Sequence, residues 1–334
     1  MIDIAFLLLG LGIILLGAEV FTNGIEWLGK KLNLSEGAVG SILAAVGTAL
    51  PETMIPVIAI LFSPGEEGHD IGIGAILGAP FMLSTLAFFL VGVAAILFKK
   101  RRRNVKVMKV DISTMTRDLS FFIMVYSVAV LSAFLPSHTM KLVVVVFLVG
   151  AYGYYVWRTL KEEGDLGEEH DLSPLFFSRK SPDPGLKIVI LQVLAALGLI
   201  ILGAHEFVAS IEHLAGILGI PQFILALIIA PIATELPEKF NSIIWVSKGK
   251  DTLALGNITG AMVFQSSLIP ALGIALTEWN LTFTAMVSAA FALTSSLIVY
   301  VQLRRNKYLT PVSLMSGGFF YLLFVLLVIT GVIR

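Results

Sequence analysis

The sequence predicts an all-α integral membrane protein of ten transmembrane helices, built as two inverted five-helix repeats with helices broken at the membrane midplane. Three observations lead to this prediction. Of the 334 residues, 57% are hydrophobic and 14% are charged, which leaves more apolar surface than a soluble domain can bury. Apolar runs long enough to cross a bilayer recur along the chain. One short proline-containing motif occurs in both halves.

The ten predicted spans are apolar runs of about 20 residues, the length that crosses the hydrocarbon core of a bilayer. They lie at residues 3–28, 37–62, 71–97, 118–136, 139–158, 187–214, 221–247, 252–276, 280–302 and 310–332. The first run has neither a basic region before it nor a small-residue cleavage site, so we expect a retained helix and not a signal peptide. The chain has no cysteine, which excludes disulfides.

The basic residues predict the orientation, because cytoplasmic loops carry an excess of Lys and Arg. The loop Lys99–Arg103 is the strongest marker, and placing it inside puts 20 of the 23 Lys and Arg on the cytoplasmic side. Lys141 and Arg334 would lie outside, and Lys239 within a span. Both termini of this multi-pass protein are therefore expected to face outward from the cell (inner) membrane. The basic loop is interpreted as a topological marker, and no nucleic-acid partner is expected.

Two repeats follow from residues that recur at a fixed spacing. Gly17 corresponds to Gly203, and Thr48 to Thr234, each pair 186 residues apart. Five spans per half is an odd number, so the second half must be inverted relative to the first. We expect repeats at 1–158 and 187–334. The segment between them, 159–186, is polar with charges of both signs, so we expect a cytoplasmic linker with little stable structure.

The repeated motif places oxygen atoms at membrane depth. It reads Gly47-Thr48-Ala49-Leu50-Pro51-Glu52 in the first half and Ala233-Thr234-Glu235-Leu236-Pro237-Glu238 in the second. Each proline removes a backbone donor and so frees the carbonyl four residues earlier, that of Gly47 or Ala233. A carboxylate at this depth is costly unless a cation meets it. Hydroxyl, carbonyl and carboxylate oxygens are ligands for a hard cation such as Ca²⁺.

Small residues with four-residue spacing follow each motif. Gly74 and Gly78 lie in the third predicted span, and Gly256 and Gly260 in the eighth. This spacing permits close approach of neighbouring helices, and packing alone would explain it equally well. Close approach would bring polar side chains toward the centre, among them Ser84, Asn257 and Gln265.

These motifs resemble those of the cation/calcium exchanger superfamily, the sodium/calcium and proton/calcium antiporters. Its two alpha repeats centre on Gly-Thr-Ser-Leu-Pro-Glu in the second and seventh spans, followed by Gly-Asn-x-x-Gly-Ser-Asn-x-x-Asn/Asp in the third and eighth. The resemblance covers residues 17–90 and 203–272. It implies that Glu52 and Glu238 are central calcium ligands, and that Thr48 and Thr234 supply oxygens to calcium or sodium.

The chain departs from the family pattern at several ligand positions. Ala79 and Ala261 replace serines, and Leu83 and Gln265 replace the final Asn or Asp. The second motif gains a carboxylate at Glu235, where the family has serine. Three carboxylates in close proximity repel one another, so one of them could exchange a proton.

We therefore expect a secondary active cation antiporter, not an enzyme, that exports Ca²⁺ in exchange for Na⁺ or H⁺ by alternating access. It would need no cofactor, and its partners would be the transported cations and the lipid bilayer. One alternative is a Na⁺/H⁺ or other monovalent cation/H⁺ antiporter without Ca²⁺ transport, which the substitutions at Ala79 and Leu83 favour. A remote alternative is an intramembrane carboxylate enzyme whose two glutamates share a proton.

Overall fold

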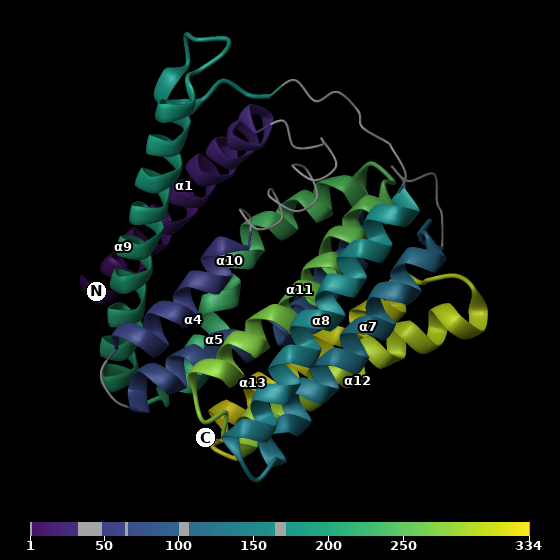
Figure 1. Cartoon of the computed structure of the whole chain (residues 1–334). Coiled ribbons are helices and arrows are strands. Elements are labelled where there is room, and N and C mark those ends of the chain that lie inside the picture. The colour runs from purple at the N-terminus through teal and green to yellow at the C-terminus, as the bar shows by residue number, and fades with distance from the viewer. Residues whose placement is uncertain (1, 33–48, 64–65, 100–106, 164–171, 334) are drawn as a thin grey trace. The chain divides into compact units, whose positions relative to one another are not determined.

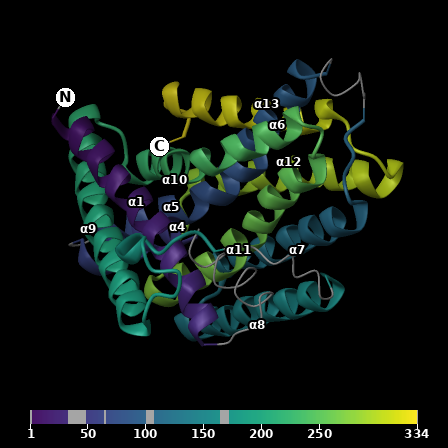
Figure 2. The ribbon, with the colours of Figure 1, turned by 90° about the horizontal axis from the view of Figure 1, so that it is seen from above.

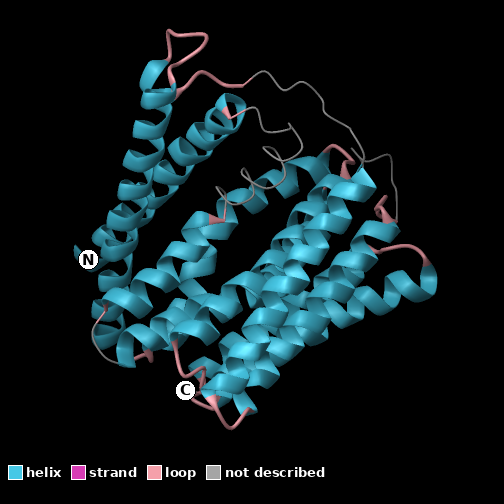
Figure 3. Ribbon diagram, viewed as in Figure 1, coloured by secondary structure: helices cyan, strands magenta, loops and turns pink. Residues whose placement is uncertain are grey.

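The computed structural model describes residues 2–32, 49–63, 66–99, 107–163 and 172–333. In this part of the chain every regular element is a helix, and β-pairing is limited to one isolated bridge between Met108 and Leu309 (Figure 3). The α-helices are α1 (Ile2–Lys31), α4 (Leu50–Phe62), α5 (Glu66–Met82), α6 (Phe88–Leu97), α7 (Ile112–Leu131), α8 (His138–Glu163), α9 (Leu186–Leu218), α10 (Gln222–Ser247), α11 (Asp251–Leu276), α12 (Phe283–Asn306) and α13 (Pro311–Ile329). A π-helix, Leu83–Ala87, joins α5 to α6, and short 3-10 helices cover Ser132–Phe134 and Phe176–Ser178.

Among the described residues, eight helical segments are long and apolar enough to cross a membrane. They are Asp3–Lys31, Glu67–Leu97, Ile112–Phe134, His138–Thr159, Leu186–Leu218, Asp251–Leu276, Phe283–Asn306 and Pro311–Ile329. Of the two other predicted spans, one is represented by the shorter helix Leu50–Phe62 and the other by the apolar part Gln222–Glu235 of α10, and residues 37–48 lie outside the described part. The prediction of an all-helical membrane protein is thus confirmed, whereas the number of ten spans stays a prediction.

The chain forms two compact units, and each takes helices from both halves of the sequence. The first unit comprises Met1–Gly68 and Gly153–Leu218, and the second His69–Tyr152 and Gly219–Arg334. Each unit is described below by itself. These units group residues by contacts, whereas the predicted repeats group them by sequence correspondence. The division into two five-helix repeats therefore stays a prediction.

In the first unit, α1 and α9 lie side by side and run antiparallel (Figures 1 and 2). A methyl group on Gly10 would lie 2.9 Å from the carbonyl oxygen of Gly203, and one on Gly203 would lie 2.8 Å from that of Gly10. Further along α1, a methyl group on Gly17 would lie 3.2 Å from the carbonyl oxygen of Ala196. Glycine is therefore what lets the two helix backbones approach so closely.

The strap, our name for residues 172–185, is held against the ends of α1 and α9 by hydrogen bonds. From α1, Asn23 Nδ2 and Trp27 Nε1 both donate to the carbonyl oxygen of Ser173, at 3.2 and 2.9 Å. From α9, Gln192 Oε1 accepts from the backbone N–H of Phe177 at 2.9 Å. Gln192 Nε2 also donates to Asn23 Oδ1 at 3.0 Å, which links the two helices.

The strap corrects one expectation. Residues 159–186 were expected to hold little stable structure, but α8 extends to Glu163 and the strap is anchored. Leu175 is fully buried and packs with Trp27 and Val189. The polar composition was misleading because polar side chains of α1 and α9 satisfy the backbone groups of the strap. Residues 164–171 lie outside the described part.

In the second unit, α7 begins six residues before the predicted span start at 118. Asp111 caps this helix, because its side chain accepts from the backbone N–H groups of Ser113 and Thr114 at 2.9 and 3.2 Å. The backbone hydrogen bond from Thr114 is the main reason that the pKa of Asp111 lies below its ordinary value of 3.8. The cap lets a polar stretch continue the helix beyond the apolar run.

The two glycine pairs of the second unit have different surroundings. A methyl group on Gly74 would lie 2.4 Å from the carbonyl oxygen of Phe223, and one on Gly78 would lie 2.3 Å from that of Leu227. The predicted close packing is therefore confirmed where α5 meets α10. At Gly256 and Gly260 of α11, by contrast, an added methyl group would meet no described atom within 4 Å.

Candidate functional site

The second motif lies on α10, and its first three residues are buried. The exposed fraction is 9% for Ala233 and 2% for both Thr234 and Glu235. Thr234 Oγ1 donates to the carbonyl oxygen of Ala230, one turn earlier, at 3.0 Å. The hydroxyl proton is thereby used within the helix, and the oxygen keeps its acceptor capacity. A carboxylate as deeply buried as that of Glu235 is costly unless polar groups or cations meet it.

Gln265 of α11 supplies one such polar group. Its Nε2 atom donates to Glu235 Oε1 at 3.1 Å, and both side chains are 2% exposed. The other amide atom, Gln265 Oε1, is buried and has no hydrogen-bond partner among the described residues. The structure thus brings together two predicted site residues. They present carboxylate and amide oxygens, which hard cations prefer.

This oxygen set is only part of a calcium site, which needs six to eight ligands. In the described part of the chain, no three His, Cys, Asp or Glu residues form a group that could hold a metal ion. Glu238 lies on α10, but its side chain is outside what the structure describes. Gly47 and Thr48 also lie outside the described residues.

The predicted interruption of the seventh span is not seen, because α10 is helical from Gln222 to Ser247 and so passes through Pro231 and Pro237. A proline removes one backbone hydrogen bond, but its fixed φ angle is compatible with a helix, so helical geometry can continue through it. The carbonyl of Ala233 still lacks the N–H donor that residue 237 would otherwise provide. The freed acceptor that the sequence predicted therefore remains, without a break in the helix.

In the first unit, Glu52 lies in the first turn of α4, which begins at Leu50. Pro51 occupies the start of the helix, where its missing N–H would have had no helical acceptor anyway. The Glu52 side chain is 8% exposed. A carboxylate in this position is stabilised by the positive end of the helix dipole. The first copy of the motif is thus a helix start and the second copy is the interior of a long helix.

Two other predicted site residues make contacts of their own. Ser84 Oγ donates to the carbonyl oxygen of Pro80 at 2.7 Å, and the carbonyl of Ser84 accepts from Ser295 Oγ at 2.5 Å. Asn257 Nδ2 is 3.5 Å from Ser242 Oγ, which makes it a weak contact of α11 with α10. In the described part of the chain, the hydrogen bonds of these side chains do not lead to Glu235.

Asp118 of α7 is a buried carboxylate that belongs to none of the motifs in the sequence. It is 2% exposed, and its Oδ2 accepts from Thr259 Oγ1 of α11 at 2.8 Å. Its Oδ1 accepts from Arg117 Nε at 3.2 Å. Nearby, a cavity of about 30 Å³ between α7 and α11 is lined in part by Thr114 and Thr259, and it could hold one water molecule. Residue 118 lies at the first position of a predicted span. Charged residues are common at span ends, so the sequence does not distinguish Asp118 as a site residue.

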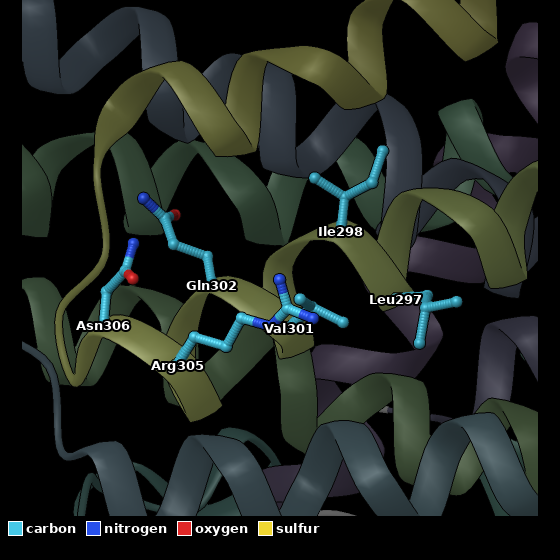
Figure 4. Close-up of a pocket in the computed structure, with 6 residues that line it drawn as sticks. All are labelled: Leu297, Ile298, Val301, Gln302, Arg305 and Asn306. Atoms are coloured by element: carbon cyan, nitrogen blue, oxygen red, sulfur yellow. The ribbon is translucent and has the colours of Figure 1, made fainter.

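The groove in Figure 4 is a different kind of surface. All its lining residues belong to α12: Leu297, Ile298, Val301, Gln302, Arg305 and Asn306. None is a carboxylate, and the three apolar side chains are 36–47% exposed. Exposed apolar side chains along one spanning helix are what a lipid-facing surface requires. We therefore do not assign a cation site to this groove.

Comparison with known proteins identifies relatives over nearly the whole chain. The profile of the family described as "Sodium/calcium exchanger protein" matches residues 2–161 and 188–332. The chain is 25% identical over 333 residues to the sodium/calcium exchanger MaX1 of Methanosarcina acetivorans, covering 88% of this chain and 90% of the relative. It is 23% identical over 275 residues to the inner membrane protein YrbG of Escherichia coli, covering 82% and 79%.

Solved structures with a similar fold include the H⁺/Ca²⁺ exchanger CAX, with a TM-score of 0.67, 17% identity and coverage of 98% of this chain and 82% of the other. The sodium-calcium exchanger NCX_Mj has a TM-score of 0.56, 20% identity and coverage of 99% and 98%. At these identities the likeness concerns the fold. Together with the profile match over both halves, it shows that the chain belongs to the sodium/calcium exchanger protein family, whose members are membrane transporters and not enzymes.

Proposed function

We propose that this protein is a secondary active antiporter that exports Ca²⁺ in exchange for Na⁺ or H⁺. The observation that carries the proposal is the buried contact between Glu235 of α10 and Gln265 of α11, 3.1 Å long, in a chain of this family. A cation is the partner that best offsets a carboxylate at membrane depth. Relatives include proteins named as a sodium/calcium exchanger and an H⁺/Ca²⁺ exchanger. The counter-ion gradient would supply the energy, so no cofactor is needed.

The proposed architecture has ten spans in two inverted repeats that alternate access to the ion. The antiparallel packing of α1 and α9 supports it, because an inverted second half requires its first span to run opposite to that of the first half. The contacts also match under the predicted equivalence, since Gly17 with Ala196 is the repeat counterpart of Gly203 with Gly10. By the distribution of Lys and Arg, we place both termini on the outer side of the inner membrane.

The proposed ion site draws oxygens from both motifs. We assign Glu52 and Glu238 as central ligands, supported by the following residues: Gly47, Thr48, Ala233, Thr234, Glu235, Ser84, Asn257 and Gln265. We infer that Glu235 replaces oxygens lost from the third span. In favour of this, the positions that would have carried those oxygens are buried and apolar, with Ala79 2% and Leu83 0% exposed.

The same two apolar positions favour a second candidate function. With fewer neutral oxygens than the family pattern provides, the site could select a monovalent cation and exchange it for H⁺ without Ca²⁺ transport. Ca²⁺ needs six to eight oxygen ligands, so the loss of neutral oxygens weakens a calcium site. Glu235 would then be the group that binds the proton.

The test is ion flux in proteoliposomes of the purified protein. Ca²⁺ uptake is measured with an outward Na⁺ gradient and, separately, with an outward H⁺ gradient. Uptake under either gradient supports calcium exchange and identifies the counter-ion. If neither gradient moves Ca²⁺, the calcium proposal is wrong, and Na⁺/H⁺ exchange in the same vesicles tests the second candidate.

Variants connect the flux to the site. Glu52→Gln and Glu235→Gln keep the shape of each side chain and remove its charge, so both are expected to reduce cation-dependent flux by at least tenfold. Glu67→Gln, at an exposed position near the start of α5, is the matched control and should leave flux unchanged. If H⁺ is the counter-ion, Glu235→Gln should also flatten the pH dependence of the residual flux.

A further inference from the structure

A basic groove lies where the strap meets the end of α1. It has a volume of about 350 Å³ and is bounded by Trp27 and Lys30 of α1 and by strap residues that include Arg179 and Lys180. Among the described residues that line it, three side chains are cationic and none is a carboxylate. A concave surface with this charge pattern concentrates anions.

Two of the three cations are held in place by aromatic rings. Lys30 Nζ lies 5.0 Å from the ring centroid of Trp27, and Arg179 Cζ lies 5.2 Å from that of Phe176. A cation–π contact orients a charged group without neutralising its charge. The carboxylate of Asp183, also on the strap, is bound by Lys31 at 2.5 Å. Lys30 and Arg179 are thus positioned by the rings, and Lys31 is the main partner of the nearby Asp183 carboxylate, so the described groove residues carry a net positive charge.

The groove also lies at a definite depth in the membrane. The first candidate span ends at Lys31, and the span on α9 begins at Leu186, directly after the strap. The ends of spanning helices reach the headgroup region, where Trp, Lys and Arg side chains are enriched. Arg and Lys are the side chains that bind phosphate oxygens, Arg through its planar fork of donors.

We propose that this groove binds a phosphate-bearing anion, either the headgroup of an anionic phospholipid or a soluble phosphate. The site is preformed, because the strap is fixed to α1 through Asn23 and Trp27 and to α9 through Gln192. The proposal depends only on the first unit. It therefore stands or falls separately from the ion site and the transport function.

The experiment titrates the purified full-length protein in detergent and follows its thermal unfolding. The probes are short-chain phosphatidylglycerol, short-chain phosphatidylcholine and inorganic phosphate. Phosphatidylglycerol is expected to stabilise the protein more than phosphatidylcholine. Each basic residue near an anionic headgroup contributes about fivefold in affinity, so K30Q/R179Q/K180Q should weaken phosphatidylglycerol binding by on the order of 100-fold.

Two matched variants separate this site from general electrostatics. R304Q/R305Q/K307Q removes the same charge from the exposed end of α12 and should keep the affinity for phosphatidylglycerol. K30R/R179K/K180R keeps the charge of the groove and should retain most of the binding. The melting temperature of each variant without ligand checks its folding.

The outcomes are distinct. Stabilisation by phosphatidylglycerol but not by inorganic phosphate identifies a lipid headgroup as the ligand, and stabilisation by both identifies a soluble phosphate site. Equal affinity of the wild type and K30Q/R179Q/K180Q would overturn the proposal. So would an equal loss in R304Q/R305Q/K307Q, or no preference of the wild type for either anionic probe over phosphatidylcholine.

Discussion

The two glycine pairs allow a sharp test of helix packing, because their sequence pattern is the same and their surroundings differ. In Gly78→Ala, the new methyl group would lie 2.3 Å from the carbonyl oxygen of Leu227, whereas ordinary contact begins at 3.4 Å. The helices α5 and α10 would have to separate by about 1 Å, and overpacking of this kind costs about 1–3 kcal/mol. In Gly260→Ala, the methyl group would meet no described atom within 4 Å.

The second substitution is expected to be neutral or stabilising, because replacing a glycine inside a helix by alanine gains about 0.5–1 kcal/mol. The helix-propensity gain is the same in both variants, so their free energies of unfolding should differ by the overpacking cost, about 1–3 kcal/mol. The assay is thermal unfolding of the purified protein in detergent, where a difference on the order of 5 °C is expected. Equal melting temperatures of Gly78→Ala and the wild type would refute the packing of α5 on α10. An equal loss in Gly260→Ala would refute the expected difference between the two glycine positions.

Three further predictions concern buried polar contacts and a helix cap. Gln265→Leu removes the amide donor to the buried carboxylate of α10 and should cost about 1.5–3 kcal/mol of unfolding free energy; an unchanged melting temperature would contradict the contact. Thr259→Val removes the hydroxyl donor to Asp118 and should cost about 1–3 kcal/mol, whereas Thr294→Val on an exposed helix face should cost less than about 0.5 kcal/mol. Asp111→Ala should cost about 1 kcal/mol at neutral pH through loss of the α7 cap. Because the pKa of Asp111 lies below its ordinary value of 3.8, this contribution is present above the unfolded-state pKa and disappears as the pH falls through the folded-state pKa. Melting curves of Asp111→Ala and the wild type should therefore converge in acid, and a constant difference at every pH would count against the cap.

The sequence was a good guide to the spanning helices, because a bilayer selects long apolar runs that are visible without knowledge of contacts. The start of α7 was predicted too late, since its first turns are polar and are capped by Asp111. The interruption at Pro237 was expected from the local cost of proline and is absent from α10. The local cost of a proline does not determine whether the other interactions of the helix are strong enough to offset it.

The candidate site was predictable in part. The motifs and their spacing led to Glu235 and Gln265, which the structure brings into contact. Asp118 could not be found in this way, because its partner Thr259 is 141 residues away and only folding joins them. The strap was missed for the same reason, since its anchors Asn23 and Gln192 are distant in sequence from the backbone groups that they bind.

The strap also makes the two ends of the α1–α9 pair mechanically unequal. At one end, side chains of both helices share hydrogen bonds with the strap and with each other. At the other end, His213 Nδ1 and Asp3 Oδ1 make an exposed contact of 3.2 Å. Thermal fluctuations should therefore separate the two helices least at the strapped end and most near Asp3. The α1–α9 pair thus has one end held by shared hydrogen bonds and one end that is less constrained.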